Sequence, residues 1–325
     1  MSETKALSFE QAQAVVQGLR KEINKVLIGQ AAVVDQVLVV LIAGGHVLIE
    51  GVPGLGKTLL VRALAKCFQG DFSRVQFTPD LMPSDVTGHA MYDMNTKQFQ
   101  VRRGPAFTNL LLADEINRAP AKTQAALLEV MQERQITIEG KSFVTGAPFM
   151  VLATQNPVEQ EGTYPLPEAE LDRFLMKIYI DYPNEQYEVA MVREITGGSS
   201  NGGFKLDDVN ALIKPANVAA LQHLVANFTV DEQVLDYAVR IVRATRDWPG
   251  VSMGAGPRGS LALIRTAKAQ ALINGHDFVT PDDIKAIAKP VLRHRLLLSA
   301  DLEIEGVSQD RVLDDVLAQI EAPRT

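Results

Sequence analysis

The side chains best suited to chemistry in this sequence end a glycine-rich run. Gly51-Val52-Pro53-Gly54-Leu55-Gly56-Lys57-Thr58 fits the pattern G-x-x-x-x-G-K-[ST]. Its glycines allow backbone N–H groups to wrap a phosphate that side chains would exclude. The Lys57 ammonium can then contact the β- and γ-phosphates of a nucleotide, and the Thr58 hydroxyl can bind Mg²⁺. Because an apolar run precedes this segment and a helical one follows it, we predict an ATP site over Gly51–Thr58 and Leu59 rather than an ordinary glycine turn.

A second group of candidate residues follows the apolar run Leu110–Ala113, which ends in Asp114 and Glu115. An apolar run followed by two acids is also a common exit from a strand. With a P-loop upstream, however, neighbouring strands would bring Asp114 beside Thr58, where both can hold Mg²⁺. Glu115 could then orient and polarise the water that attacks the γ-phosphate.

A third candidate is Asn156, in Ala153-Thr154-Gln155-Asn156-Pro157, at the end of another apolar run. Its amide could bond both the γ-phosphate and the attacking water, and so respond to hydrolysis. The alternative is a turn-forming Asn-Pro pair, and spacing alone leaves both interpretations open. The sequence has no Asn-Lys-x-Asp motif of the kind that reads guanine, so we favour ATP over GTP.

Several short apolar runs, separated by helical stretches, must position these side chains. Each run is apolar nearly throughout, which is typical of strands covered on both faces in a parallel sheet. The intervening stretches Thr58–Phe68 and Thr123–Arg134 have helical periodicity. The pattern predicts a doubly wound, three-layer αβα domain of the α/β class. The expected strands are His46–Glu50, Arg74–Phe77, Leu110–Asp114, Phe149–Thr154 and Lys177–Ile180.

Two segments interrupt the expected alternation of strands and helices. The segment Ser84–Phe107 is polar, with short apolar pieces on either side of Asp93–Gln98. In Arg134–Pro148, two short runs flank Glu139-Gly140, which is a hairpin pattern. We expect both segments to project from the core as insertions.

Capping signals predict helices near both ends of the chain. Ser8-Phe9-Glu10-Gln11 has the form of a capping box that opens an amphipathic helix, and a second helix is expected over Ala31–Ala43. Later in the chain, Thr280 is an expected N-cap, and Pro290 is expected to end that helix. The cations of Leu292-Arg293-His294-Arg295-Leu296 are expected to complement a helix dipole.

The strand pattern ends near Tyr182, and this divides the chain. A Gly- and Ser-rich loop follows at residues 197–203, and the sequence beyond it is mainly helical. We therefore predict a nucleotide-binding domain over residues 1–182 and a helical lid domain over residues 183–325.

Composition limits the remaining possibilities. The chain has 325 residues, 46% of them apolar and 22% charged, which suits two packed domains. A net charge of −7 and a pI of about 5.4 argue against a broad nucleic-acid-binding surface. The single cysteine, Cys67, excludes an internal disulfide and is expected in the core. The longest apolar run, Val37–Ala43, is too short to span a bilayer, and the polar start Met1–Lys5 lacks a signal-peptide pattern, so we expect a cytoplasmic protein without membrane insertion.

Together these motifs resemble the AAA+ superfamily and, within it, the MoxR family of ATPases, from about Ile28 to about Leu298. The two insertions look like the family's helix-2 insert and its hairpin before the sensor strand. Those features also link the sequence to magnesium-chelatase ATPase subunits and MCM helicases. The most specific pieces of the resemblance are Gly51–Thr58, Leu112-Ala113-Asp114-Glu115-Ile116-Asn117-Arg118-Ala119, Ala126-Leu127-Leu128-Glu129-Val130-Met131-Gln132-Glu133, Ala153–Pro157 and Leu166-Pro167-Glu168-Ala169-Glu170-Leu171-Asp172-Arg173-Phe174.

The resemblance assigns roles that spacing alone does not. It implies that Asn156 is sensor 1 and that Arg173 is the arginine finger that reaches the ATP of a neighbouring subunit. Arg258 resembles sensor 2 at the start of a lid helix, and the sequence leaves open whether it acts on its own or a neighbour's nucleotide. Arg118 could also face the adjoining subunit. The segment Ile28-Gly29-Gln30 resembles the adenine-side segment of such ATPases.

The resemblance implies Mg-dependent ATP hydrolysis by a homo-oligomeric ring, most often a hexamer, that remodels or matures client proteins as a chaperone does. It also implies a partner with a von Willebrand factor A domain. The alternatives are a metal-chelatase ATPase subunit, a nucleic-acid motor of the MCM type, and a nucleotide-gated scaffold. The acidic pI disfavours nucleic acid. Arg102-Arg103 in the first insertion could bind an acidic partner or nucleic acid, or could simply be solvated.

Overall fold

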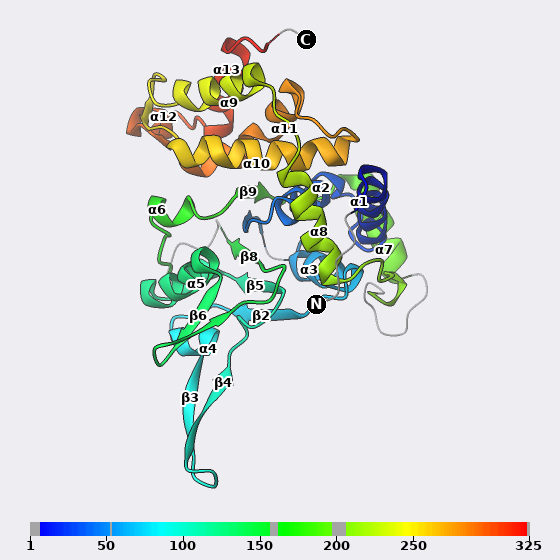
Figure 1. Cartoon of the computed structure of the whole chain (residues 1–325). Coiled ribbons are helices and arrows are strands. Elements are labelled where there is room, and N and C mark those ends of the chain that lie inside the picture. Colours follow the sequence, from blue (N-terminus) through cyan, green and yellow to red (C-terminus); the bar gives the residue numbers. More distant parts are fainter. Residues whose placement is uncertain (1–6, 53, 157–161, 197–205, 324–325) are drawn as a thin grey trace.

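A five-stranded parallel sheet forms the centre of the computed structural model (Figure 1), which describes residues 7–52, 54–156, 162–196 and 206–323. The strand order is β2-β5-β8-β1-β9. Each predicted strand is present, with its ends within two residues of those expected, and the α/β fold class is confirmed. The strands of this sheet are β1 (Val47–Glu50), β2 (Phe72–Gln76), β5 (Leu110–Asp114), β8 (Met150–Gln155) and β9 (Met176–Tyr179).

Alternation of side chains along these strands gives the sheet two apolar faces. In β5, Leu110 belongs to one buried cluster, whereas its neighbour Leu111 belongs to the other. Helix α3 (Lys57–Cys67) packs into the first cluster, and α5 (Ala121–Glu133) packs into the second. Because helices cover both faces, the central strands β1, β5 and β8 are apolar nearly throughout, whereas the edge strands β2 and β9 carry polar side chains such as Arg74 and Lys177.

The two predicted N-terminal helices are α1 (Phe9–Asn24) and α2 (Ala31–Ile42). The capping box is formed: Ser8 Oγ accepts a hydrogen bond from the Gln11 N–H at 3.3 Å, and Gln11 Oε1 accepts one from the Ser8 N–H at 3.1 Å. Both helices pack into the same cluster as α3, which contains Cys67. Burial raises the pKa of the Cys67 thiol to about 12, in keeping with the core position expected for it.

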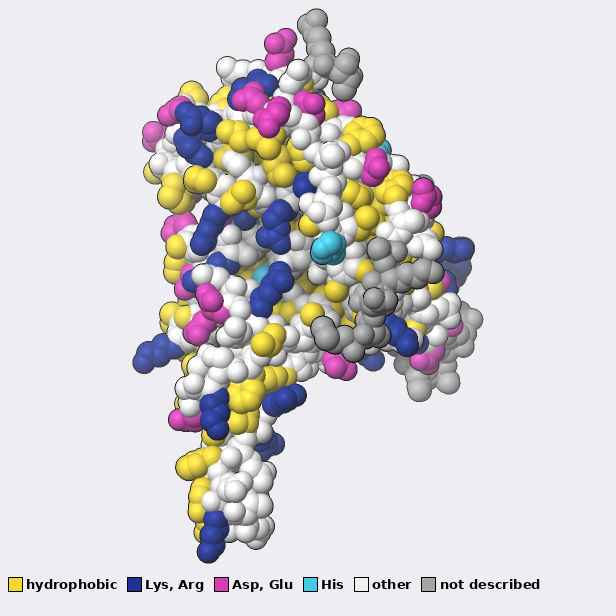
Figure 2. Space-filling model, in the orientation of Figure 1, with side chains coloured by type: hydrophobic (Ala, Val, Ile, Leu, Met, Phe, Trp, Pro, Cys, Tyr) yellow, Lys and Arg dark blue, Asp and Glu magenta, His cyan; other side chains and the backbone are white. Residues whose placement is uncertain are grey.

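Two hairpins interrupt the core where insertions were predicted. After the short helix α4 (Pro83–Thr87), β3 (Gly88–Asp93) and β4 (Gln98–Arg103) form an antiparallel ladder that projects well beyond the sheet (Figure 1). Apolar side chains run along one edge of this projection (Figure 2). The second hairpin, β6 (Gln135–Ile138) with β7 (Lys141–Val144), lies between α5 and β8 in the chain. Both hairpins pack their bases into the cluster that α5 covers.

After β9 the chain is mainly helical, as the sequence predicted, and α9 to α13 lie beyond the β9 edge of the sheet as a lid (Figure 1). Helix α8 packs against α2, and α11 contacts β9. The loop predicted at residues 197–203 lies outside the described residues. Within the described part of the chain, no helix is long and apolar enough to cross a bilayer. In chain order, the elements from α6 onwards other than β9 are α6 (Glu168–Leu171), α7 (Glu185–Thr196), η2 (Leu206–Asp208), α8 (Pro215–Ala226), α9 (Glu232–Ala244), β10 (Val251–Met253), α10 (Pro257–Asn274), α11 (Pro281–Leu292), η3 (Arg293–Arg295), β11 (Leu297–Leu298), α12 (Ala300–Ile304) and α13 (Gln309–Gln319).

One local expectation in the lid is wrong. Pro290 does not end α11, which continues to Leu292, because a proline in the last turn removes a single helix hydrogen bond and its ring is buried in the lid. The prediction of a cationic helix end is met, because the three residues of η3 directly follow α11 and Arg295 Nη1 donates to the Val291 carbonyl oxygen in its last turn, but all three residues are also buried. Their acceptors include the carbonyl oxygens of Phe174 and Leu175 in the core, which a local sequence pattern cannot reveal.

Candidate nucleotide site

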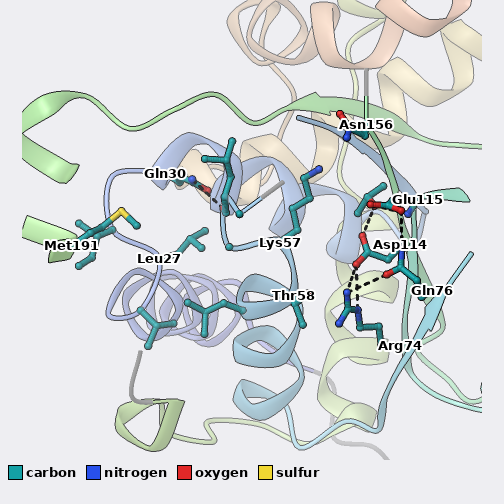
Figure 3. Close-up of a pocket in the computed structure, with 17 residues that line it drawn as sticks. Leu27, Gln30, Lys57, Thr58, Arg74, Gln76, Asp114, Glu115, Asn156 and Met191 are labelled. Carbon is teal, nitrogen blue, oxygen red and sulfur yellow. Dashed lines mark hydrogen bonds and ion pairs between the residues drawn. The ribbon is translucent and has the colours of Figure 1, made fainter. Parts of the chain in front are cut away.

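The glycine-rich loop between β1 and α3 borders a cavity of about 460 Å³ (Figure 3). Gly54 and Gly56 have φ angles of +88° and +79°, which residues with side chains rarely adopt. A Cβ at Gly51 would lie 2.5 Å from the carbonyl oxygen of Ile180, so this position also requires glycine. The loop therefore leads into the N-terminus of α3 with its backbone exposed to the cavity, as phosphate binding requires.

This cavity gathers most of the residues predicted to bind a nucleotide. Gly29, Gly51 and Val52 are not among the residues that line it, and Pro53 lies outside the described residues. Figure 3 shows Lys57 between Gln30 on one side and the acidic pair that follows β5 on the other. The predicted residues that line the cavity are Ile28, Gln30, Gly54, Leu55, Gly56, Lys57, Thr58, Leu59, Asp114, Glu115 and Asn156.

Lys57 places a cation at the centre of the loop. Its Nζ donates a hydrogen bond to the Gly51 carbonyl oxygen at 2.5 Å. Burial lowers the pKa of Lys57, while the carboxylates of Asp114, Glu115 and Glu50 act in the opposite direction. The hydrogen bond thus holds the Lys57 side chain against the loop, in the cavity where a phosphate group would bind.

Asp114, at the C-terminal end of β5, already accepts hydrogen bonds on both carboxylate oxygens. Thr154 Oγ1 donates to Oδ1 at 2.5 Å, and Arg74 Nη2 pairs with Oδ2 at 2.6 Å. Asp114 and Thr58 line the same cavity, and Mg²⁺ in nucleotide sites takes one or two such oxygens together with phosphate oxygens. The described residues contain no cluster of three or more His, Cys, Asp or Glu side chains able to hold a metal alone. This donor set fits a metal ion that arrives with a nucleotide.

Glu115 combines an unusual backbone with a tethered side chain. Its φ of +56° and ψ of +51° lie in the left-handed region, which is uncommon for a residue other than glycine. Its N–H donates to Thr154 Oγ1 at 2.9 Å. Its Oε2 accepts a hydrogen bond from Gln76 Nε2 at 2.8 Å and lies 3.2 Å from Arg118 Nε. The turn after β5 therefore directs this carboxylate into the cavity with two donors on one of its oxygens.

Sequence reasoning missed three polar residues of this cavity. Arg74 and Gln76 are separated by the buried Val75 on β2, so they share the face of the strand that meets the acidic pair. Thr154 lies on β8 and touches both acids from the other side of β5. The alternation of polar and apolar residues in β2 could have shown that Arg74 and Gln76 share a face. Only the strand order shows that this face meets Asp114 and Glu115 at the end of β5.

The far end of the cavity is mostly apolar and fits a base better than a phosphate. Val26, Leu27 and Met191 line it together with the predicted Ile28 and Gln30. Met191 was not predicted from the sequence, because α7 reaches the cavity from beyond the last strand of the sheet.

Helix α7 also closes over the predicted adenine-side segment. Gly29 has a φ of +81°, and a Cβ there would lie 2.7 Å from the Tyr187 side chain, so only glycine fits beneath α7. Gln30 Nε2 donates to the Leu55 carbonyl oxygen at 3.3 Å and links this segment to the glycine-rich loop. The predicted segment Ile28-Gly29-Gln30 therefore contacts both α7 and the glycine-rich loop.

Two of the predicted catalytic residues lie elsewhere. Arg173 and Arg258 line a second cavity, of about 240 Å³, which lies between the core and the lid. Arg173 Nη1 donates to the Leu128 carbonyl oxygen at 3.0 Å, and Arg258 Nη1 lies 3.6 Å from Asp172 Oδ2. The structure thus brings Arg173 and Arg258 together, and it places both of them apart from Glu115 and Asn156.

Comparisons with protein families cover most of the core and the lid. The family described as "ATPase family associated with various cellular activities (AAA)" matches residues 46–176. A second family, described as "AAA lid domain", matches residues 243–316. The first match covers the sheet-containing part of the chain, and the second covers α10 to α12 with the end of α9 and most of α13.

Individual relatives agree with these matches. The chain is 43% identical to "Chaperone MoxR1" of Mycobacterium tuberculosis, over 93% of this chain and 81% of that protein. It is 30% identical to "Protein MoxR" of Methylorubrum extorquens, over 87% and 88% of the two chains. A crystal structure of a protein assigned as an ATPase from Cytophaga hutchinsonii is 40% identical, with a TM-score of 0.89 over 97% of each chain.

Proposed function

The chain belongs to the AAA ATPase family, in its MoxR group, and from this premise we propose that it hydrolyses Mg-ATP as a ring of identical subunits and uses the turnover to remodel client proteins. One observation carries the proposal. The predicted catalytic residues divide between two cavities of one chain, with Glu115 and Asn156 in the first and Arg173 and Arg258 in the second. A complete site then requires two subunits, because the two sets face different cavities.

In the subunit that holds the nucleotide, the residues of the first cavity would bind and position. Bound Mg-ATP would supply the reacting phosphoryl group and neutralise part of its charge. Lys57 would contact the β- and γ-phosphates, and Thr58 and Asp114 would hold the metal. Glu115 would accept the proton of the attacking water.

The adjacent subunit would complete the site with Arg173 and Arg258. A guanidinium beside the transferring phosphoryl group offsets its charge, and supplying it from a neighbour makes turnover depend on assembly. Arg258 lies beside Asp172, which directly precedes Arg173 in the chain, so we assign both arginines to the neighbour's nucleotide.

Kinship supports the part of the proposal that concerns client proteins. A relative that is 43% identical is described as a chaperone, and we extend that role to this chain. We include in the proposal the hexamer and the partner with a von Willebrand factor A domain that the resemblance implies. Relatives described as magnesium-chelatase subunits are more distant, at 28% and 27% identity, and therefore do not lead us to a chelatase.

Three variants test the proposal. Lys57→Ala should lose nucleotide binding in a titration with a fluorescent ATP analogue, and unchanged affinity would contradict the site. Glu115→Gln should bind ATP without hydrolysing it. Arg173→Ala should bind ATP normally and turn over about a thousandfold more slowly.

Mixed rings test the shared site itself. Rings assembled from equal amounts of Glu115→Gln and Arg173→Ala subunits should regain activity, because each Arg173→Ala subunit with a Glu115→Gln neighbour receives an intact finger. No recovery at any mixing ratio would contradict a site shared between subunits.

A further inference from the structure

The turn that carries Arg173 is held from the lid by one buried arginine. The Arg295 side chain, in η3, is only 4% exposed. Its Nε donates to Asp172 Oδ1 at 2.7 Å, and its Nη2 donates to the Phe174 carbonyl oxygen at 2.8 Å. These two bonds hold Asp172 and Phe174, the residues on either side of Arg173, and so they fix the backbone that carries the Arg173 side chain.

Asp172 also reaches the second predicted arginine. Its other oxygen, Oδ2, lies 3.6 Å from Arg258 Nη1. The Arg258 side chain is 62% exposed, whereas that of Asp172 is 26% exposed. The Asp172 carboxylate therefore connects the buried guanidinium of Arg295 to that of Arg258, which is accessible to solvent and to a neighbouring molecule.

The Asp172 carboxylate offsets part of the positive charge that lines the second cavity. Arg173, Arg258, Arg265 and Arg295 line the cavity, and Asp172 is the one acid among its described lining residues. Cations this close repel one another, and a carboxylate between them lowers that cost. The positive excess that remains would attract a phosphate group.

We propose that Asp172 is a positioning residue for the finger half of the shared site. With Arg295 behind it, its carboxylate holds Arg173 and Arg258 side by side, ready for the γ-phosphate of a neighbouring subunit. This inference rests on the proposed function, because it takes the two arginines to act between subunits. The alternative is that the pair of Asp172 and Arg295 only fastens the lid to the core.

Asp172→Asn separates these two readings, because it keeps the shape of the side chain and removes its charge. We expect turnover to fall about tenfold to a hundredfold through misplacement of the arginines. The affinity for a fluorescent ATP analogue should not change, since Asp172 does not line the cavity that contains Lys57.

Mixed rings then identify which half of the site the variant damages. Asp172→Asn with Glu115→Gln should regain activity, because the Asp172→Asn subunit can hydrolyse ATP with a neighbour's intact finger. Asp172→Asn with Arg173→Ala should regain none, because neither subunit presents a working finger. The variant would thus fall in the same complementation group as Arg173→Ala.

Asp310→Asn is the matched control. Asp310 pairs with Arg293 of the same buried tripeptide, at 2.9 Å, and its side chain is 28% exposed, but it does not line the cavity that contains Arg173. The melting temperature of this variant should fall, because the buried Arg293 loses its paired charge, but its turnover in the folded state should stay close to wild type. A loss of turnover as large as that of Asp172→Asn would overturn the proposal in favour of a role in lid attachment.

Two further outcomes also decide the question. Recovery of Asp172→Asn with Arg173→Ala, or no recovery with Glu115→Gln, would overturn the positioning role alone. Failure of the control mixture of Glu115→Gln with Arg173→Ala would instead overturn the shared site, and the role of Asp172 with it.

Discussion

His46 is a side chain whose protonation state is set by its neighbours. Its Nδ1 accepts a hydrogen bond from the Val151 N–H at 2.9 Å, so its Nε2 carries the proton and donates to the Met131 carbonyl oxygen, 3.1 Å away. The ring thereby joins the start of β1 to β8 and to the end of α5. Burial lowers the pKa of His46 from 6.5 to about 4, so the folded protein keeps the ring neutral.

This residue should make the folded state sensitive to acid. In the unfolded chain His46 takes up a proton near pH 6.5, whereas in the folded protein it does so only near pH 4. The unfolded state therefore binds the extra proton within that window, and stability that is present above pH 6.5 is lost as the pH falls towards 4. The loss should reach about 3 kcal/mol in the free energy of unfolding, measured in urea at a series of pH values.

His46→Asn is the matched variant, because its amide keeps a donor and an acceptor but does not titrate. We expect it to be less stable than wild type at neutral pH and to decline less steeply between pH 6.5 and pH 4. Burial also lowers the pKa of His294, and that contribution is common to both proteins. Parallel stability curves for the two proteins would show that His46 does not cause the slope.

Among the site residues, those with a local signature were predictable and those defined by the sheet were not. Lys57 and Glu115 stand in motifs whose chemistry can be read from neighbouring residues. Arg74 and Thr154 reach the same carboxylate from β2 and β8, which flank β5 in space. No local pattern specifies that strand order, so their partners became visible only in the fold.

At the scale of elements, the β3–β4 hairpin carries apolar side chains along one of its faces. Tyr92 opposes Phe99, with ring centroids 5.3 Å apart, and Ala90 opposes Val101 on the same face. The Ala90–Val101 pair packs against the core, but Phe99 is 75% exposed and Met94 at the tip is more exposed still. An aromatic pair presented on a projecting ladder is a surface suited to binding another chain.

This hairpin should be separable from the ATPase site. The double variant Tyr92→Ser and Phe99→Ser removes an exposed pair that contributes about 0.2–1 kcal/mol, so the melting temperature should barely change. Neither residue lines the nucleotide cavity, so turnover without a client should stay within about twofold of wild type. Client protein retained by the ATP-loaded Glu115→Gln ring should decrease when the two changes are added. Undiminished retention would exclude this face as a client contact.

The elements themselves followed from the sequence wherever one property repeats along a segment. The three central strands β1, β5 and β8 are apolar on both faces, and α1 opens with a complete capping box. The cations of η3 do lie at the end of a helix, as predicted, but nothing in the local sequence indicates that these three residues are buried. Their burial depends on backbone acceptors in β9 and in the turn before it.

At the scale of the whole molecule, the direction of the strands in the sheet separates the predicted catalytic residues into two groups. In a parallel sheet the C-terminal ends of all strands lie at one edge. Glu50, Asp114 and Gln155 end β1, β5 and β8, so the residues that follow them gather at that edge around the nucleotide cavity. Arg173 instead precedes β9, which runs parallel to β1, and it therefore lies at the opposite edge. No side-chain rotation within one chain can bridge the sheet.

Turnover should therefore depend on protein concentration, while nucleotide binding should not. The cavity that contains Lys57 and Thr58 is complete in one chain, so the affinity for a fluorescent ATP analogue should remain constant on dilution. Turnover per subunit should fall as rings dissociate, because Arg173 is then lost from the neighbouring site. A dilution series followed by ATPase assay and analytical ultracentrifugation would place both transitions on one concentration axis. Arg173→Ala should show the dissociation without a further fall in its residual rate. Constant turnover by a protein that sediments as a monomer would mean that the opposite edge of the sheet has no part in the chemistry.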